Sequence, residues 1–307
     1  MPTSLAQQEL VVVTGKGGVG KSSIAAALGR NLGEIQAVRA GATLILEIDP
    51  RESVHRQLGV PPSGGEIRRV GPGLYLQNLQ PRRVIDRIVE KRVRVPALVR
   101  RVFASAIYEQ FVTGAPGLEA LAVLWHALRL VRGEVREAPQ VARVVLDAPA
   151  TGHGVSLLTA PRLVSEVIAG GPVGEMTREV AEWVSRQDLV GVVVAAMAEE
   201  MPVTEALDLR RRLSGELDRE PQLLVVNAVY PKVPERLNSA SDELTGLWRR
   251  RRRLNDSELS RLGKEWRRPD VELPLLPLGA GPELVSALAQ PLARWTSAST
   301  SAGADAS

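Results

Sequence analysis

Continuous apolar runs alternate along this chain with segments in which apolar residues recur every three or four positions. The runs at 10–13, 43–48 and 141–147 are rich in Val, Leu and Ile, which is typical of strands buried on both faces. The periodic segments between them predict amphipathic helices. Strands that alternate with helices in this way predict a doubly wound α/β fold with a mostly parallel sheet and helices on both faces.

The same pattern places the remaining elements. Further strands are predicted at 74–79, 189–196, 222–226 and 271–276. Helices are predicted at 24–32, 156–169, 175–186, 202–217, 235–266 and 282–295. Between 51 and 69 we expect a short helix followed by a loop, because the segment Pro61-Pro62-Ser63-Gly64-Gly65 favours turns.

Residues 82–138 differ in character from their surroundings, because their apolar positions follow helical spacing with breaks near Pro96 and Pro116. We therefore predict a helical subdomain at 82–138, inserted into an α/β core formed by 1–81 and 139–296. The tail at 297–307 is small and polar, and we expect it to be disordered.

Composition narrows the class of protein. The chain has 307 residues and contains no cysteine, which excludes disulfides, thiolate metal sites and cysteine nucleophiles. Residues 1–9 lack the basic and apolar regions of a signal peptide, and no apolar run approaches the length of a membrane span. A cytoplasmic protein is the expectation. The formal net charge is only +4, which is weak evidence for a polyanionic partner.

A glycine-rich loop follows the first strand and precedes the first helix. Its sequence is Gly15-Lys16-Gly17-Gly18-Val19-Gly20-Lys21-Ser22, with Ser23 directly after it. Backbone N–H groups of such a loop cradle a polyphosphate at a helix N-terminus. Lys21 is expected to reach the β- and γ-phosphates, and the Ser22 hydroxyl to bind Mg²⁺. We predict that the chain binds ATP together with Mg²⁺.

Two aspartates follow predicted strands and are expected at the same edge of the sheet as this loop. Asp147 ends one apolar strand, where a carboxylate would hold Mg²⁺. Asp49 ends another, where it would help to bind Mg²⁺ and would orient or deprotonate the attacking water. The alternative is that each aspartate only caps the following turn.

Lys16 is not required by an ordinary phosphate loop. With it, the motif resembles the deviant Walker A loop of the SIMIBI class of ATPases. This class includes MinD, ParA, the nitrogenase iron protein, and the ArsA and tail-anchored-protein-targeting ATPases. The resemblance implies that Lys16 reaches the nucleotide of a partner subunit, so that ATP is coupled to face-to-face dimerisation.

Other segments are similar to the ArsA and tail-anchored-targeting branch. The segment from Asp147 to His153 resembles its switch II, and Glu47-Ile48-Asp49-Pro50 resembles its switch I. Asn227 matches the asparagine that reads adenine, and Pro274 lies in a segment that resembles the loop beside the base. The resemblance implies that Asp49, Lys16 and Lys21 are catalytic.

The sequence also departs from this branch. Without cysteine, the chain is not expected to capture arsenite through thiolates. Its four methionines all lie outside 82–138, whereas the client groove of the targeting factors is rich in methionine. Glu52 occupies the position of the switch I histidine, which predicts altered chemistry in that segment. His55 and His126 show no metal-ligand spacing and receive no role.

Five consecutive arginines occupy 249–253, and Arg267 and Arg268 follow Trp266. Five successive residues of one helix point in all directions, so a solvated helix with local ion pairs is the favoured interpretation. An anionic surface, such as lipid headgroups or a nucleic acid, is the alternative.

Three functions fit these observations. The favoured one is an ArsA-like ATPase that works as a homodimer, or as a heterodimer with a paralogous subunit, and handles a protein client. The second is a nucleotide-gated scaffold that assembles with a paralogue or into a filament. The third is a ParA-like or MinD-like organiser on DNA or a membrane surface, for which peripheral membrane contact is favoured over nucleic acid.

Overall fold

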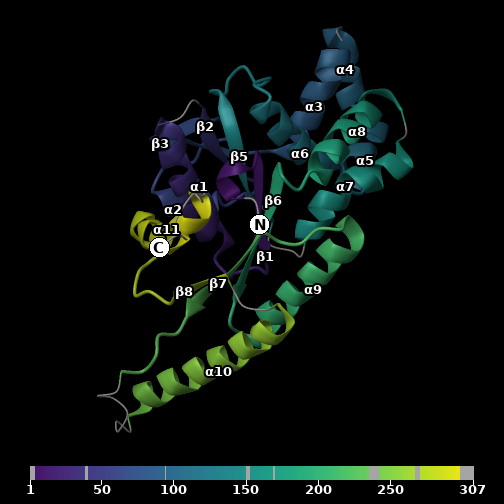
Figure 1. Cartoon of the computed structure of the whole chain (residues 1–307). Helices are drawn as coiled ribbons and strands as arrows, with labels where there is room; N and C mark the ends of the chain where they lie inside the picture. Colours follow the sequence, from purple (N-terminus) through teal and green to yellow (C-terminus); the bar gives the residue numbers. More distant parts are fainter. Residues whose placement is uncertain are drawn as a thin grey trace, which may run out of the picture.

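The computed structural model describes residues 4–38, 41–93, 95–149, 153–168, 170–234, 242–266 and 270–297. Within them lies an eight-stranded sheet in the order β3-β4-β2-β5-β1-β6-β7-β8 (Figure 1). Its strands are β1 (Leu10–Gly15), β2 (Ala42–Glu47), β3 (Arg68–Gly71), β4 (Leu74–Asn78), β5 (Val141–Asp147), β6 (Val190–Met197), β7 (Leu223–Val229) and β8 (Val271–Pro274). Only the pairing of β3 with β4 is antiparallel, which confirms the predicted, mostly parallel α/β class.

Strand β3 was not predicted. Its sequence, Arg68-Arg69-Val70-Gly71, has no apolar run, and all four residues are at least partly exposed at the edge of the sheet. Charged residues are common on edge strands because they discourage pairing with another chain. The periodicity that reveals buried strands is therefore absent here, and the first two residues of β3 fall in the segment 51–69, for which the sequence predicts a short helix and a loop.

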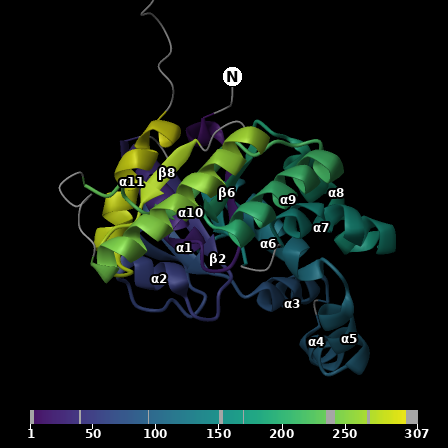
Figure 2. The same cartoon turned by 90° about the horizontal axis from the view of Figure 1, so that it is seen from below.

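Helices cover both faces of the sheet (Figures 1 and 2). One face carries α1 (Lys21–Val38), α2 (Ser53–Leu58) and α11 (Pro282–Thr296), and the other carries α6 (Leu118–Val131), α7 (His153–Val167), α8 (Gly171–Ser185) and α9 (Glu200–Leu217). Strand β1 explains why the central strands read as continuous apolar runs. Its Leu10 and Val12 belong to the core on one face, while Val11 and Val13 belong to the core on the other.

The helices between β4 and β5 are α3 (Pro81–Arg92), α4 (Pro96–Phe103), α5 (Ala106–Gly114) and α6. Proline begins both α3 and α4, a position where the backbone N–H has no partner within the helix, so its absence costs no hydrogen bond. Figure 2 shows α4 and α5 projecting away from the sheet. By contrast, α6 packs on β5, α7 and α8, so the segment predicted as an insertion is joined to the core through this helix.

No single helix in the described parts of the chain is long and apolar enough to cross a membrane. The segments Tyr108–Gly114 and Leu118–Val131 pass that test only as a pair, and they are bent by 83° at the break between them.

Helix α10 (Glu243–Glu265) lies at the edge where the parallel strands end (Figure 1). Asp242 caps its first turn by accepting a hydrogen bond from the Thr245 N–H. Asn255, buried in its middle, donates to the Ala198 carbonyl after β6 and accepts from the Tyr230 N–H after β7. One polar side chain thus fastens α10 across two strand ends.

His126 on α6 is a buried histidine whose ring Nε2 contacts Gln77 Oε1 at 2.8 Å. Burial, together with the charges of Arg87 and Arg129, lowers its pKa to about 4. The neutral imidazole is therefore the form that the folded chain favours, and a proton binds more readily to this residue once the chain unfolds.

This residue predicts part of the acid sensitivity of the fold. As the pH falls from 7 to 4.5, the unfolded chain protonates His126 and the folded chain resists, which removes about 2 kcal/mol of stability. His126→Gln should lose that share of the pH dependence, because glutamine does not titrate and can still bond to Gln77. Urea denaturation of both proteins at the two pH values measures it. An equal loss in both proteins would contradict the prediction.

Candidate functional site

The glycine-rich loop connects β1, in the middle of the sheet, to α1. Three of its glycines are held in conformations that other residues rarely adopt, with φ of +146° at Gly15, +86° at Gly18 and +93° at Gly20. A Cβ on Gly15 would lie 2.1 Å from the Ala195 carbonyl oxygen, and one on Gly20 would lie 2.2 Å from Asn227 Nδ2. Glycine is therefore required at both positions by backbone conformation and by space.

Both lysines of the loop have partners. Lys21 Nζ donates to the Lys16 carbonyl at 2.9 Å, so its side chain folds back along the loop. Burial lowers the pKa of Lys21, while the charges of Asp147 and Glu205 act in the opposite direction. The Lys16 side chain contacts Glu205 Oε1 at 2.5 Å, in its own chain. To reach the nucleotide of a partner subunit, as expected from the sequence, Lys16 would have to leave this ion pair within its own chain.

Ser22 and Asp147 meet at the base of the loop. The Ser22 hydroxyl donates to Asp147 Oδ2 at 2.6 Å. Burial raises the pKa of Asp147 to about 6, against the opposing effects of Ser22 and Lys21. The other carboxylate oxygen, Oδ1, is buried and has no hydrogen-bond partner among the described residues. An oxygen pair with one unsatisfied acceptor suits Mg²⁺, which prefers carboxylate and hydroxyl ligands.

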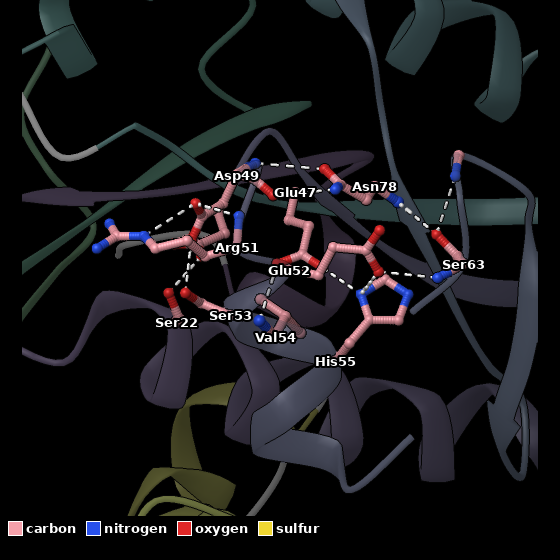
Figure 3. Close-up of polar contacts among 12 residues, drawn as sticks. Ser22, Glu47, Asp49, Arg51, Glu52, Ser53, Val54, His55, Ser63 and Asn78 are labelled. Carbon is pink, nitrogen blue, oxygen red and sulfur yellow. Dashed lines mark hydrogen bonds and ion pairs between the residues drawn. The ribbon is translucent and has the colours of Figure 1, made fainter. Parts of the chain in front are cut away.

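Asp49 follows β2 and presents a carboxylate that is 23% exposed. Its oxygens accept hydrogen bonds from the Ser53 hydroxyl at 2.5 Å and from the Arg51 N–H at 3.0 Å (Figure 3). Partial burial would raise the pKa of Asp49, but these bonds and the Arg51 charge hold it below its ordinary value. Asn78 bonds to both the N–H and the carbonyl of Asp49, which fixes the backbone at this position.

A network around a buried glutamate, which the sequence did not reveal, lies beside Asp49 (Figure 3). Glu47, at the end of β2, is fully buried and contacts His55 Nδ1, while its second oxygen accepts from the Val54 N–H at 2.8 Å. Glu52 lies 3.4 Å from the same histidine nitrogen and accepts from the Ser63 N–H at 2.8 Å. Burial raises the pKa of Glu47.

Ligand atoms of Glu47, Glu52 and His55 lie within 4.8 Å of one another, a spacing that could hold a metal ion. However, Glu47 and His55 are in direct contact, and both carboxylates already accept backbone hydrogen bonds. We therefore interpret the group as a hydrogen-bonded network that fixes the segment carrying Asp49. Its only sequence signal is a glutamate that ends an otherwise apolar strand, with a histidine eight residues later.

Asn227 is brought to the loop, where its Nδ2 donates to the Val19 carbonyl at 2.9 Å. It lies within β7, which continues three residues beyond the predicted strand end at 226. Pro274 is the last residue of the edge strand β8, where it pairs with Val229. Of the predicted switch II segment, 150–152 lies outside the described residues, and His153 begins α7.

The arginines at 249–253 point to different sides of α10, as the sequence predicted. Arg252 is turned toward the strand ends, donating to the Tyr230 carbonyl and pairing with Asp256 at 2.6 Å. Arg250 and Arg253 are exposed and have no ion-pair partner among the described residues. Arg267 and Arg268 lie outside the described residues.

The sequence was compared with known proteins. The family model of anion-transporting ATPases matches residues 8–170, more than half of the chain. ATPase BagA of Mycobacterium tuberculosis is 29% identical over 227 residues, which cover 69% of this chain and 63% of that protein. A putative arsenical pump-driving ATPase of Chlorobaculum tepidum is 25% identical over 247 residues, covering 75% and 56%. ATPase GET3C of Arabidopsis thaliana is 28% identical over 173 residues, covering 52% and 42%. The chain thus spans less than two thirds of the length of these relatives.

The network around Glu47 predicts a measurable loss of stability when one partner is removed. His55→Leu leaves a carboxylate oxygen of the fully buried Glu47 without its hydrogen-bond partner, and the free energy of unfolding should fall by about 2 to 3 kcal/mol. In Glu47→Gln with His55→Leu, glutamine still accepts from Val54 but carries no charge, so more than half of the loss should be recovered. Urea denaturation at neutral pH compares the three proteins. A double variant no more stable than the single one would contradict a stabilising contact between Glu47 and His55.

Proposed function

The chain belongs to the family of anion-transporting ATPases, and we propose that it hydrolyses ATP with Mg²⁺ in a site completed by a second subunit. One observation carries this proposal: Lys21, Ser22 and the unsatisfied Asp147 carboxylate converge at the phosphate loop between β1 and α1. We propose that the loop residues 15–23 hold the phosphates, and that Asn227 and Pro274 contact the base.

Lys21 supports phosphate binding through the weakness of its present contact. A backbone carbonyl is a neutral acceptor, whereas the β- and γ-phosphates are charged and bind an ammonium group more strongly. On nucleotide binding, Lys21 would exchange the Lys16 carbonyl for phosphate oxygens. The buried lysine would then neutralise charge that develops on the transferred phosphoryl group.

Ser22, Asp147 and Asp49 would hold Mg²⁺, which neutralises phosphate charge and orients the phosphoryl group when bound. The Ser22 hydroxyl would donate a hydrogen bond to the Asp147 carboxylate, which leaves the lone pairs of its oxygen to bind Mg²⁺. Asp49 is held ionised by the bonds that lower its pKa. Such a weak base orients a water molecule better than it deprotonates one, so we assign it the orienting role.

Lys16 supports a site shared between subunits. It stands at the mouth of the loop with a side chain that is 31% exposed, and it makes no contribution to the Mg²⁺ donor set. We propose that it crosses to the nucleotide of a second subunit, either a copy of this chain or a paralogue. Some relatives are named for driving an arsenical pump. This chain has no cysteine, so the proposal carries over their ATPase chemistry and not capture of arsenite by thiolates.

The shared site predicts a strong effect of one exposed lysine. Lys16→Ala should lower ATP turnover by about 100-fold or more, because a charge aimed at the transition state is lost. Release of phosphate is measured over a range of protein concentrations, with Lys264→Ala on α10 as the matched control. Turnover per subunit should fall on dilution in the wild-type protein. Full activity of Lys16→Ala, or turnover independent of dilution, would contradict a shared site. Light scattering with ATP identifies a scaffold if assembly proceeds without turnover.

Peripheral contact with an anionic membrane is a second candidate function, favoured by the outer side of α10. Leu244, Leu247 and Leu254 are 78%, 45% and 57% exposed. They alternate along the helix with exposed arginines, including Arg250 and Arg253. Arginine attracts anionic headgroups, and exposed leucine gains by entering the interface. A nucleic acid would use the arginines but not the leucines, so the leucines favour lipid.

The membrane proposal predicts that charge and apolar surface act together. The protein should sediment with vesicles that contain phosphatidylserine and not with neutral vesicles. Replacing Leu247 and Leu254 by Ser should weaken this binding severalfold without changing ATP turnover, since neither residue contacts the phosphate loop. The matched control is Leu278→Ser, at an exposed leucine after β8. Binding that the α10 leucine variant leaves unchanged, or binding to DNA of equal strength, would contradict the assignment.

A further inference from the structure

Glu205 of α9 is a charged residue at the phosphate loop that belongs neither to the phosphate-binding group nor to the Mg²⁺ donor set. Helix α9 follows β6, the neighbour of β1, so its first turns lie at the edge of the sheet where the loop begins. From there the Glu205 carboxylate meets Lys16 Nζ at 2.5 Å. The side chains are 39% and 31% exposed, which leaves the pair reachable from solvent and from a second subunit.

We propose that Glu205 is a positioning residue that holds Lys16 within its own subunit, and that Lys16 must leave Glu205 before two subunits close around ATP. This inference rests on the proposed function, because it concerns the lysine that would cross between subunits. The Glu205 carboxylate would compete with the nucleotide of the second subunit for Lys16.

The resting arrangement of the loop supports this role. Lys16 is held twice, by Glu205 through its side chain and by Lys21 through its carbonyl. Both contacts involve groups that the proposed function assigns to phosphate. The two lysines of the loop thus contact acceptors of their own chain, the Glu205 carboxylate and the Lys16 carbonyl. Binding of nucleotides would replace these acceptors with phosphate oxygens.

The negative charge of Glu205 opposes phosphate binding and favours the resting position of Lys16. The Glu205 carboxylate also acts electrostatically on Lys21, so it lies close to the region that the phosphates would enter. A negative group there repels a polyphosphate while it attracts the lysines. Removing the charge of Glu205 should therefore release Lys16 and favour closure, whereas simple damage to α9 would do the reverse.

The chain provides a matched control on the same helix. Glu200 is exposed in the first turn of α9, and no ion pair of its side chain is found among the described residues. Glu200→Gln makes the same change in net charge as Glu205→Gln, about one and a half turns away. A difference between the two variants thus reports the contact with Lys16 and not the charge of the protein as a whole.

The first measurement uses the nucleotide-free chain and needs no partner. Acetylation of lysines by an N-hydroxysuccinimide ester is followed at Lys16 by peptide mass spectrometry, with Lys264 as the internal reference. Glu205→Gln should raise the labelling rate of Lys16 about two- to fivefold, the range expected for losing a partly exposed ion pair. Glu200→Gln should leave the rate unchanged. Equal rates in wild type and Glu205→Gln would overturn the contact in solution.

The second measurement is self-association with ATP, followed by light scattering in the Asp49→Asn background to prevent turnover. Glu205→Gln should lower the protein concentration at half-association about two- to fivefold, and Glu200→Gln should not. Self-association with ATP that requires Lys16, yet reaches its half-point at the same protein concentration with and without Glu205→Gln, would show that the positioning role is wrong. If no Lys16-dependent association occurs while labelling does respond to Glu205, the shared site is wrong and the ion pair stands.

Discussion

The close packing of the glycine-rich loop against the residues beside it at the end of β1 is the constraint on which the rest of the site depends. Gly15 lies against the Ala195 carbonyl of β6, and Gly20 lies against the Asn227 side chain of β7. A Cβ on Gly15 would meet the backbone of β6, and the φ of +93° at Gly20 would strain any other residue, so these two positions restrict the path of the loop. That path starts α1 at Lys21 and brings Ser22 to Asp147, because β5 is the other neighbour of β1.

Buried charge is concentrated on one side of this loop and arranged in separate pairs. Asp147 faces Ser22 and Lys21, whereas Glu47 faces His55 one strand farther out. Asp49, two residues after Glu47, is more exposed and is held ionised by short-range hydrogen bonds. This arrangement gives three neighbouring carboxylates different affinities for protons. Glu47 is tied to the segment after β2, Asp147 keeps one oxygen without a partner among the described residues, and Asp49 is the most accessible of the three.

The sequence predicted what periodicity and motif spacing encode. The buried strands, the helices between them and the convergence of Ser22 with Asp147 follow from apolar runs and from the parallel order of strands. The edge strand β3 was missed because it buries no continuous apolar face. The partners Glu205 and His55 were missed for a different reason. Each pairs with a residue from another element, and such a contact depends on how helices pack, which no local pattern records.

The hydrogen bond from Asn227 to the Val19 carbonyl has a consequence for selectivity. A side-chain amide has few donors, and one of them is already committed to the shape of the loop. If Asn227 also reads the base, the two tasks draw on the same group. Binding of the base and rearrangement of the phosphate loop then become thermodynamically linked. The free energy by which one favours the other is the same in both directions. A nucleotide with the wrong base would bind to a loop that is still held in its resting shape.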